Sequence, residues 1–200
     1  MAGVSGGLEA ASFNQTPPFE DISLFESDMA LKAAVARACP PAQAGELSAF
    51  GKYFGSAATM RLGRLANENP PRLKIIDAAG NRTDLIEFHP AYHDLMQKSM
   101  AAGLHCSVFA SKEEGRVCAR AARIFMATQA EAGHICPMSM TNAAFAALSA
   151  SPSILSSWQK LMLSPAYDPA AKPWFEKEAV TLGMGMTERQ GGTDVNANIT

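Results

Sequence analysis

Proline positions divide this chain into segments of helix length, and this division limits the folds open to it. The pairs Pro40-Pro41 and Pro70-Pro71 each end an apolar stretch, because proline has no amide hydrogen to donate within a helix. The first stretch predicts a helix over residues 28–38, capped by Asp28 or by the serine before it. The second predicts one helix over residues 44–67, since apolar side chains recur there at helical spacing. The recurring side chains are Phe50, Phe54, Ala58 and Leu62.

Four more helices are predicted farther along the chain. Pro90 suits the first turn of a helix over residues 90–102. Ser111 and Glu114 have the spacing of a capping box, which predicts a helix that runs to about Ala132. Its core-facing stripe is expected to be Val117, Ala121, Ile124, Phe125 and Thr128. Two further helices, over residues 137–150 and 153–163, are rich in Ala, Leu and Met, so they are expected to be largely buried.

The apolar pattern changes between residues 73 and 88. Residues 73–77 and 83–88 are rich in Leu and Ile, and a turn-forming Gly80-Asn81 step lies between them. This arrangement predicts a short β-hairpin with its turn over residues 78–81. The fold expected is therefore mainly α, with one small hairpin.

The two ends of the chain differ from this helical body. Residues 1–27 predict an extended arm whose apolar second half packs on the body of the chain or on a partner subunit. Pro165, Pro169 and Pro173 argue against a regular element over residues 165–178. Beyond them, residues 180–186 alternate bulky side chains with Thr and Gly, which predicts a strand with one bare face. The predicted divisions are an arm over 1–27, a helical domain over 28–164, a linker over 165–178 and the start of a β domain over 179–200.

Composition excludes several classes of protein. The formal net charge is -2 and the isoelectric point is about 6.1, so no global field would recruit nucleic acid or anionic lipid. No apolar run approaches the roughly 20 residues that span a bilayer, and the first residues lack the pattern of a targeting peptide. The four cysteines are widely spaced, which indicates reduced thiols in a cytoplasmic protein.

The stretch from Met184 to Thr193, MGMTERQGGT, is the strongest candidate for a binding site. If Gly191 and Gly192 adopt positive φ, their N–H groups can point toward one anion. Thr187 and Thr193 add hydroxyl groups, which suits a phosphate-bearing cofactor lying along a strand. The alternative from the residues alone is a glycine-rich turn that binds nothing.

Several long strings together resemble one family. GMGMTERQGGTDV is similar to the flavin-binding signature of the acyl-CoA dehydrogenase family, in the form found in its AidB-type branch, which is named for the adaptive response to alkylation. The strings FNQTPP, LGRLANENPP, FHPAYHDLM and ARAARIFMATQAEAGHICPMSMT agree with that branch in the same order. The resemblance runs from about Phe13 to Thr200, nearly the whole chain.

The resemblance implies an FAD-dependent oxidoreductase that introduces an α,β double bond into an acyl-CoA thioester, with hydride passing to flavin N5. It implies that the backbone of Met186 and the hydroxyl of Thr187 face the pyrimidine edge of the flavin, and that Thr193 replaces a family serine at the diphosphate. The residues expected to line the flavin are Met184, Gly185, Met186, Thr187, Glu188, Arg189, Gln190, Gly191, Gly192 and Thr193.

The resemblance also bears on what this chain lacks. The catalytic Glu of the family lies in a C-terminal helical domain, as does most of the cofactor cradle, so these 200 residues alone are expected to be inactive. The parent protein is expected to be a homo-oligomer, a tetramer by resemblance. The alternative is a DNA-associated protein of the alkylation-damage response with a vestigial or regulatory flavin site, which would bind DNA through its C-terminal region.

Three other groups of residues have a functional and a plainer interpretation. His89 and His93 could hold a metal, but polar packing or helix capping is favoured. Cys136 could be a reactive thiol, but a buried apolar position is favoured. A third group, on adjacent turns of one helix, could meet phosphate, but a solvated face paired with Glu113 and neighbouring acids is favoured. That group is Arg116, Arg120 and Arg123.

Overall fold

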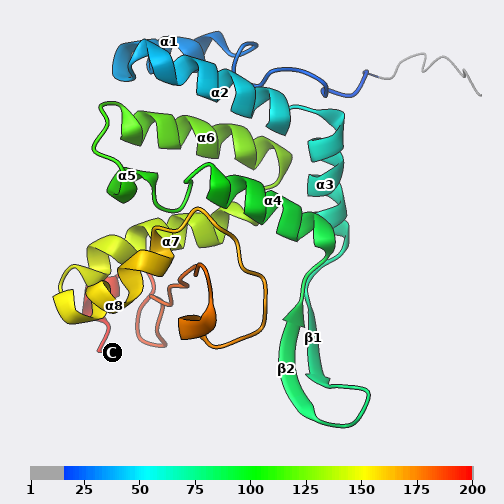
Figure 1. Ribbon diagram of the computed structural model, residues 1–200, viewed down its shortest axis with the longest axis vertical. Coiled ribbons are helices and arrows are strands. Elements are labelled where there is room, and N and C mark those ends of the chain that lie inside the picture. Colours follow the sequence, from blue (N-terminus) through cyan, green and yellow to red (C-terminus); the bar gives the residue numbers. More distant parts are fainter. Residues whose placement is uncertain (1–15, 200) are drawn as a thin grey trace, which may run out of the picture.

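The structure is a computed structural model that describes residues 16–199, so the expectations for Phe13 and the rest of residues 1–15 lie outside the described residues. Helices dominate it, and a two-stranded sheet accompanies them (Figure 1). The helices are α1 (Met29–Ala38), α2 (Pro41–Phe54), α3 (Ala57–Glu68), α4 (Pro90–Ala101), α5 (Ser107–Ala110), α6 (Arg116–Ala130), α7 (Ile135–Leu148) and α8 (Pro152–Met162). The strands are β1 (Arg72–Ile76) and β2 (Arg82–Glu87), and two 3-10 turns cover Trp174–Glu176 and Val195–Ala197. The mainly helical fold with a hairpin is confirmed.

Helix α6 lies at the centre of the bundle, between α2 and α4 (Figure 1). The stripe predicted for it is wrong, because Val117 and Phe125 are 61% and 50% exposed. The buried positions are instead Ala119, Ala122, Met126 and Ala127. Three of the four are alanines, whose small side chains let the neighbouring helices approach α6 closely. A pattern search that favours bulky side chains selects the opposite face of such a helix.

The single helix predicted over residues 44–67 is two helices, α2 and α3, and the arm explains the break. A Cβ on Gly55 would lie 2.1 Å from the carbonyl oxygen of Ile22, so the arm and Gly55 can approach only because no side chain intervenes. The Ile22 amide donates to the Gly55 carbonyl at 3.2 Å. Leu24 and Phe25 are buried in the core, so the second half of the arm packs on the body of the chain.

The start of α6 also differs from the prediction. Ser111 Oγ accepts from the amide of Glu113 at 3.0 Å, and the helix begins later, after Gly115. Gly115 has φ of +76°, and a Cβ there would lie 2.6 Å from the carbonyl oxygen of Ala38. The capping box is therefore not formed, because the contact with the end of α1 sets where α6 begins. The short helix α5 was not predicted.

The hairpin is confirmed and projects beyond α3 and α4 (Figure 1). Leu73 lies opposite Ile86, and the register shifts between Lys74 and Ile76. Every residue of both strands is exposed. The Asp77 carboxylate closes the turn by accepting from the amides of Ala79 at 2.8 Å and Asn81 at 2.9 Å. The hairpin is therefore held by its own turn and ladder rather than by the helical core.

The last two helices, α7 and α8, confirm the predictions for residues 137–150 and 153–163. The expected burial does not hold for either helix: the buried residues are Ile135, Met138, Thr141 and Phe145 in α7 and Met162 in α8. The strand predicted over residues 180–186 is not formed, because no described segment pairs with it; the nearest ladder contact is an isolated bridge between Glu188 and Gly191. Within residues 16–199, no helix has the length and apolar character needed to cross a membrane.

Candidate functional site

The candidate site begins where the chain leaves the helical body, at residues 179–182. Ala179 and Val180 are buried, the latter in a cluster with Phe145 and Met162. The amide of Leu182 donates to the hydroxyl of Thr141 on α7 at 2.9 Å. That hydroxyl in turn donates to a carbonyl of its own helix at 2.7 Å. Leu182 is therefore the last firm attachment of the chain to α7.

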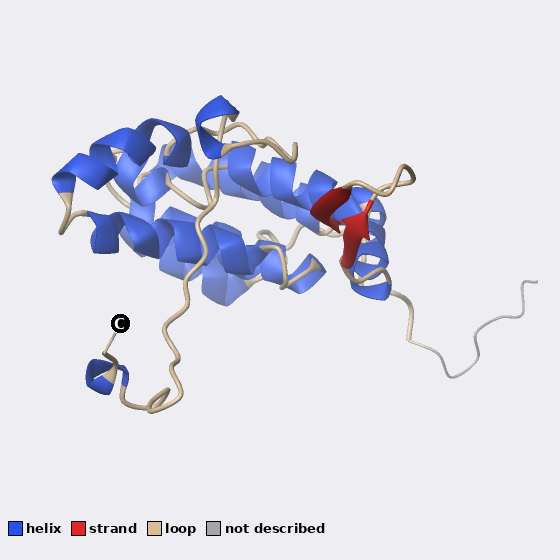
Figure 2. Cartoon of the chain, turned by 90° about the horizontal axis from the view of Figure 1, so that it is seen from below, coloured by secondary structure: helices blue, strands red, loops and turns tan. Residues whose placement is uncertain are grey.

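Beyond Leu182 the chain extends away from the helices and ends in a compact turn (Figure 2). The predicted flavin-lining residues 184–193 all lie in this extension, and eight of the ten are exposed, all but Glu188 and Gly191. A Cβ added to Gly183 or Gly185 would touch nothing within 4 Å. The bare face predicted from the alternation is thus present, although the strand itself is not.

The tip of this segment is a tight turn around Arg189 and Gln190. The amide of Glu188 donates to the carbonyl of Gly191 at 2.9 Å, and the reverse bond is 3.2 Å. The Glu188 carboxylate accepts from the Gln190 side chain and, at 3.2 Å, from the amide of Ile199. Asn198 donates to the carbonyl of Met186. Glu188 therefore organises the turn through both its backbone and its carboxylate.

The glycine pair in the turn does not form the predicted nest. Neither Gly191 nor Gly192 has a positive φ, whereas three other glycines of the described chain do. A Cβ on Gly192 would lie 2.9 Å from Cγ2 of Thr187, and one on Gly191 would lie 2.9 Å from the carbonyl oxygen of Asp194. Glycine is needed here for close approach rather than for a left-handed backbone. Thr187 and Thr193 are both exposed, and within residues 16–199 their hydroxyls make no hydrogen bond.

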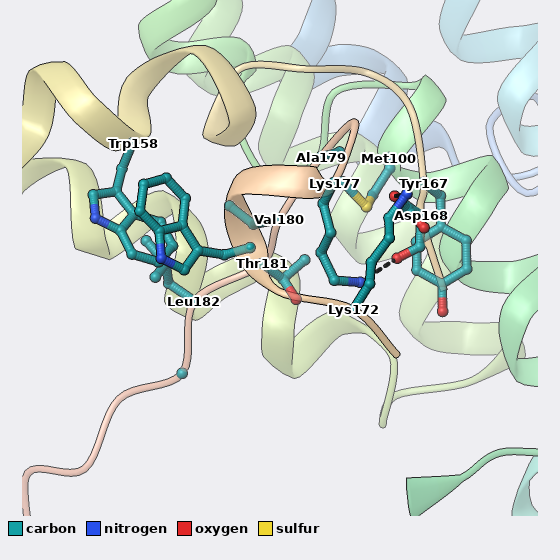
Figure 3. A pocket seen from close by; sticks show the side chains of 12 residues that line it. Met100, Trp158, Tyr167, Asp168, Lys172, Lys177, Ala179, Val180, Thr181 and Leu182 are labelled. Atoms are coloured by element: carbon teal, nitrogen blue, oxygen red, sulfur yellow. Dashed lines mark hydrogen bonds and ion pairs between the residues drawn. The ribbon is translucent and has the colours of Figure 1, made fainter. Parts of the chain in front are cut away.

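A hollow of about 320 Å³ lies at the root of the extension, between α8, the end of α4 and the loop after Ser164 (Figure 3). Its floor is largely apolar, from Met100, Val180 and Leu182, and Lys172 and Lys177 stand at its edge. Trp158 and Trp174 stack at its other side with ring centroids 4.2 Å apart. The predicted site residues are next to this hollow in sequence but do not line it.

Asp168 organises the loop that borders the hollow. Its carboxylate accepts from Lys172 at 3.0 Å and from the amides of Ala170 at 3.0 Å and Glu178 at 3.1 Å. The Lys172 hydrogen bond is the main reason that the pKa of Asp168 is lowered to about 2. Lys177 donates to the carbonyls of Asp168 at 2.9 Å and Ala170 at 2.6 Å. Residues 165–178, predicted as a plain linker, therefore form an ordered loop; the acid followed four residues later by Lys172 was the available sequence signal.

The two histidines considered as metal ligands have other roles. His89 caps α4, its Nδ1 accepting from the amide of Ala91 at 3.1 Å. His93 Nδ1 lies 2.7 Å from the hydroxyl of Tyr167, which joins α4 to the loop of Asp168. Within residues 16–199 no group of three acidic, His or Cys side chains is arranged to hold a metal ion. Cys136 is exposed, so the expectation of burial was wrong.

The three arginines of α6 do not form a free cationic stripe. Arg116 Nε donates to the carbonyl of Val108 at 3.0 Å, and Arg120 Nε donates to that of Leu104 at 2.6 Å. Arg123 pairs with Glu46 at 2.8 Å. The expected pairing with the Glu113 carboxylate is wrong: Arg116 contacts the Glu113 carbonyl instead. Arg116 and Arg120 therefore donate to backbone carbonyls between α4 and α6. Arg123 links α6 to α2 through its ion pair with Glu46.

The core also holds a buried polar network that the sequence did not predict. Ser99 Oγ lies 2.9 Å from Nε2 of His134, whose Nδ1 lies 2.9 Å from the carboxylate of Glu131. The ring is fully buried, and burial lowers the pKa of His134 despite the nearby carboxylate. The network assigns the proton to Nδ1, so that Ser99 donates to Nε2. With no exposure, these groups cannot meet a substrate, and they join α4 to the corner between α6 and α7.

Comparison with solved structures identifies the fold of the chain. The chain superposes on Caenorhabditis elegans ACDH-11, solved in complex with C11-CoA, with a TM-score of 0.74 at 24% identity, over 97% of this chain and 33% of that one. The chain therefore has the same fold as the matched third of that protein.

Sequence comparison places the chain more closely. Residues 14–169 match the family described as the adaptive response protein AidB N-terminal domain. The chain is 41% identical to the putative acyl-CoA dehydrogenase AidB of Escherichia coli strain K12, over 94% of this chain and 35% of that protein. It is 28% identical to acyl-CoA dehydrogenase family member 11 of Caenorhabditis elegans, over 94% and 30%. The chain belongs to the AidB N-terminal domain family, and it spans about a third of the length of these relatives.

Proposed function

We propose that this chain is the N-terminal part of an FAD-dependent acyl-CoA dehydrogenase-like flavoprotein of the cytoplasm. The observation that carries the proposal is the segment 184–193, whose family signature stands exposed, with a side-chain-free face, at the end of the helical domain. A backbone of this kind lets a flat ring system come within contact distance. The family membership supports the same reading, as does the acyl-CoA bound to the nematode protein of the same fold.

The residues of the segment fit a flavin in their donor chemistry. The hydroxyl of Thr187 is exposed and, within the described chain, unused, so it is available to the pyrimidine edge of the ring. Thr193 offers a second hydroxyl for the diphosphate. FAD, when bound, supplies the hydride acceptor of the dehydrogenation. The chain's own part is to position the ring through the backbone of residues 184–187 and to keep the turn closed through Glu188.

The same geometry supports the expectation that this chain alone does not complete catalysis. Within residues 16–199, the carboxylate of this segment is that of Glu188, which accepts hydrogen bonds from the Gln190 side chain and from the amide of Ile199. The proposed base, the remaining cofactor contacts and the proposed tetrameric assembly belong to the longer protein. The alternative of a DNA-associated protein gains no support from α6, whose three arginines are engaged in the fold.

Flavin retention tests the proposal. The 200-residue chain is expected to lose flavin on desalting, whereas the product of its reading frame, expressed to its own stop codon, is expected to keep a 450 nm absorbance. In that product Thr187→Val should weaken flavin binding by about tenfold, because it removes one hydrogen bond to the ring. Thr187→Ser keeps the hydroxyl and is the matched control. A colourless product, or equal retention by both variants, would refute the assignment.

A further inference from the structure

The chain enters the flavin segment from a short stretch that is docked on α7 and α8. The amide of Val180 donates to the carbonyl of Leu161 on α8 at 3.4 Å. The amide of Leu182 donates to the hydroxyl of Thr141 on α7 at 2.9 Å. Two amides that are two residues apart are thus both turned toward the helices. Leu182 is the later of the two, and the flavin segment begins at Met184, only two residues farther on.

The Thr141 side chain is arranged to accept the bond from Leu182. It is fully buried, and its hydroxyl donates to the carbonyl of Pro137, one turn back along α7, at 2.7 Å. A threonine hydroxyl on a helix can bond back in this way, and its branched Cβ restricts the rotation of the side chain. Because the hydroxyl hydrogen is used within α7, the oxygen lone pairs are left to receive the Leu182 amide.

The contact lies beside the smaller hydrophobic cluster of the domain. Val180, Phe145 and Met162 are buried members of that cluster, and Leu182 packs against it as a partly buried neighbour. Side chains in protein interiors are close-packed, so such a cluster deforms little. The Thr141 oxygen is therefore a fixed point against which the chain is placed.

Beyond Leu182 the chain lacks such support. A Cβ on Gly183 or on Gly185 would meet nothing within 4 Å. The terminal turn is closed by bonds among its own residues, such as the one from Asn198 to the carbonyl of Met186, and these bonds do not locate the turn relative to α7. A displacement at Leu182 would consequently be passed along the chain to Met186.

We propose that Thr141 is a positioning residue for the flavin and that it acts through the amide of Leu182. The inference rests on the proposed function, in which residues 184–193 line the cofactor. With a fully buried side chain, Thr141 does not meet the ring itself. It sets where the backbone of Met186 and the hydroxyl of Thr187 lie, and hence the contacts that the segment offers to the pyrimidine edge of the ring.

Hydrogen exchange in the 200-residue chain tests the attachment without any flavin. Thr141→Val keeps the shape of the side chain but removes the hydroxyl, so the Leu182 amide should exchange about tenfold faster than in the wild type. Thr141→Ser keeps the hydroxyl and should protect the amide as the wild type does. Thr128→Val is the matched control, because the Thr128 hydroxyl also donates to a carbonyl four residues back, at 2.8 Å, but is exposed on α6. Equal exchange in Thr141→Val and Thr128→Val would overturn the attachment.

Flavin titration tests the positioning role in the product of the reading frame, expressed to its own stop codon and freed of flavin. Thr141→Val should raise the Kd for FAD about tenfold and shift the 450 nm band, whereas Thr141→Ser and Thr128→Val should match the wild type. An unchanged Kd and band, together with fast exchange at Leu182, would refute the role. A wild-type product that binds no FAD would overturn the proposed function and the role with it, while the exchange result would stand.

A variant of Leu182 removes the same hydrogen bond from the donor side and keeps the test valid even where Thr141→Val does not fold. Leu182→Pro deletes the amide hydrogen and leaves α7 unchanged, and Leu182→Ala, which keeps the amide, is its control. The proline variant should bind FAD about tenfold more weakly than the alanine variant. Equal affinities of the two would contradict the proposal.

Discussion

The buried carboxylate of Glu131 offers a sharp test of what holds the helical domain together. Its Oε2 accepts from the amide of His134 at 2.6 Å and from Nδ1 of the same residue at 2.9 Å, and Oε1 accepts from the amide of Gly133 at 2.5 Å. Gly133 is exposed, so its amide can turn to water if the carboxylate is removed. His134 is fully buried, so its two donors cannot.

The substitution Glu131→Ala leaves two buried donors without an acceptor. At about 1–3 kcal/mol for each, the free energy of unfolding should fall by about 4 kcal/mol. For a chain of this size the midpoint of thermal unfolding should then drop by roughly 8–16 °C. Urea titration followed by far-UV circular dichroism measures the first quantity, and a thermal scan by the same signal measures the second.

Two control variants make the result specific. Glu131→Gln keeps one acceptor oxygen and should cost about 1–2 kcal/mol. Glu46→Ala removes a carboxylate that is 69% exposed and paired with Arg123, and should cost less than about 1 kcal/mol. If Glu131→Ala unfolds within about 1 kcal/mol of the wild type, the buried network does not stabilise the helical domain by its hydrogen bonds.

The remaining predictions concern pH and helix contact. Burial lowers the pKa of both His134 and His105. Below about pH 6.5 the unfolded chain therefore binds protons that the folded chain does not. The free energy of unfolding should fall by up to about 1.4 kcal/mol per pH unit for each of the two histidines. Urea titrations from pH 8 to pH 5 should show this loss, and a flat profile would contradict it. Gly63→Ala should destabilise by more than about 2 kcal/mol, because its Cβ would lie 2.0 Å from the carbonyl oxygen of Ala130. Gly45→Ala, with nothing within 4 Å, should stabilise by about 0.5–1 kcal/mol, and equal effects of the two would refute the contact argument.

The sequence predicted local features better than contacts. Proline positions and periodicity were sufficient for α1, α4, α7, α8 and the hairpin, because prolines follow α1, α7 and α8 within a few residues, flank the hairpin, and begin α4. The break between α2 and α3 depends on the carbonyl of Ile22 against Gly55, and the start of α6 on the end of α1 against Gly115. Neither contact leaves a local signal, since each joins segments that are distant in sequence.

In the candidate site, too, the local features could be predicted from the sequence and the features that depend on distant contacts could not. The alternation after Val180 and the turn at Glu188 could be predicted from the local sequence. The family resemblance is confirmed by the match over residues 14–169. The strand was wrong because pairing needs a second strand, which no described segment provides. The nest was wrong because Gly191 and Gly192 relieve crowding by Thr187 and Asp194 instead of adopting positive φ. The Ser99–His134–Glu131 network was missed because its members come from two separate regions of the chain.

The hairpin has a practical consequence for work on this chain. It presents aliphatic side chains to solvent, and within residues 16–199 the outer edges of both strands have no backbone partners. Such an edge is a template for intermolecular strand addition, and apolar side chains beside it favour precipitation. The charged Lys74–Glu87 pair and the shift in register next to Lys74 partly oppose such stacking. Colloidal stability of the purified chain is therefore expected to depend on this one projecting element more than on the helical core, and to worsen as salt screens its charges.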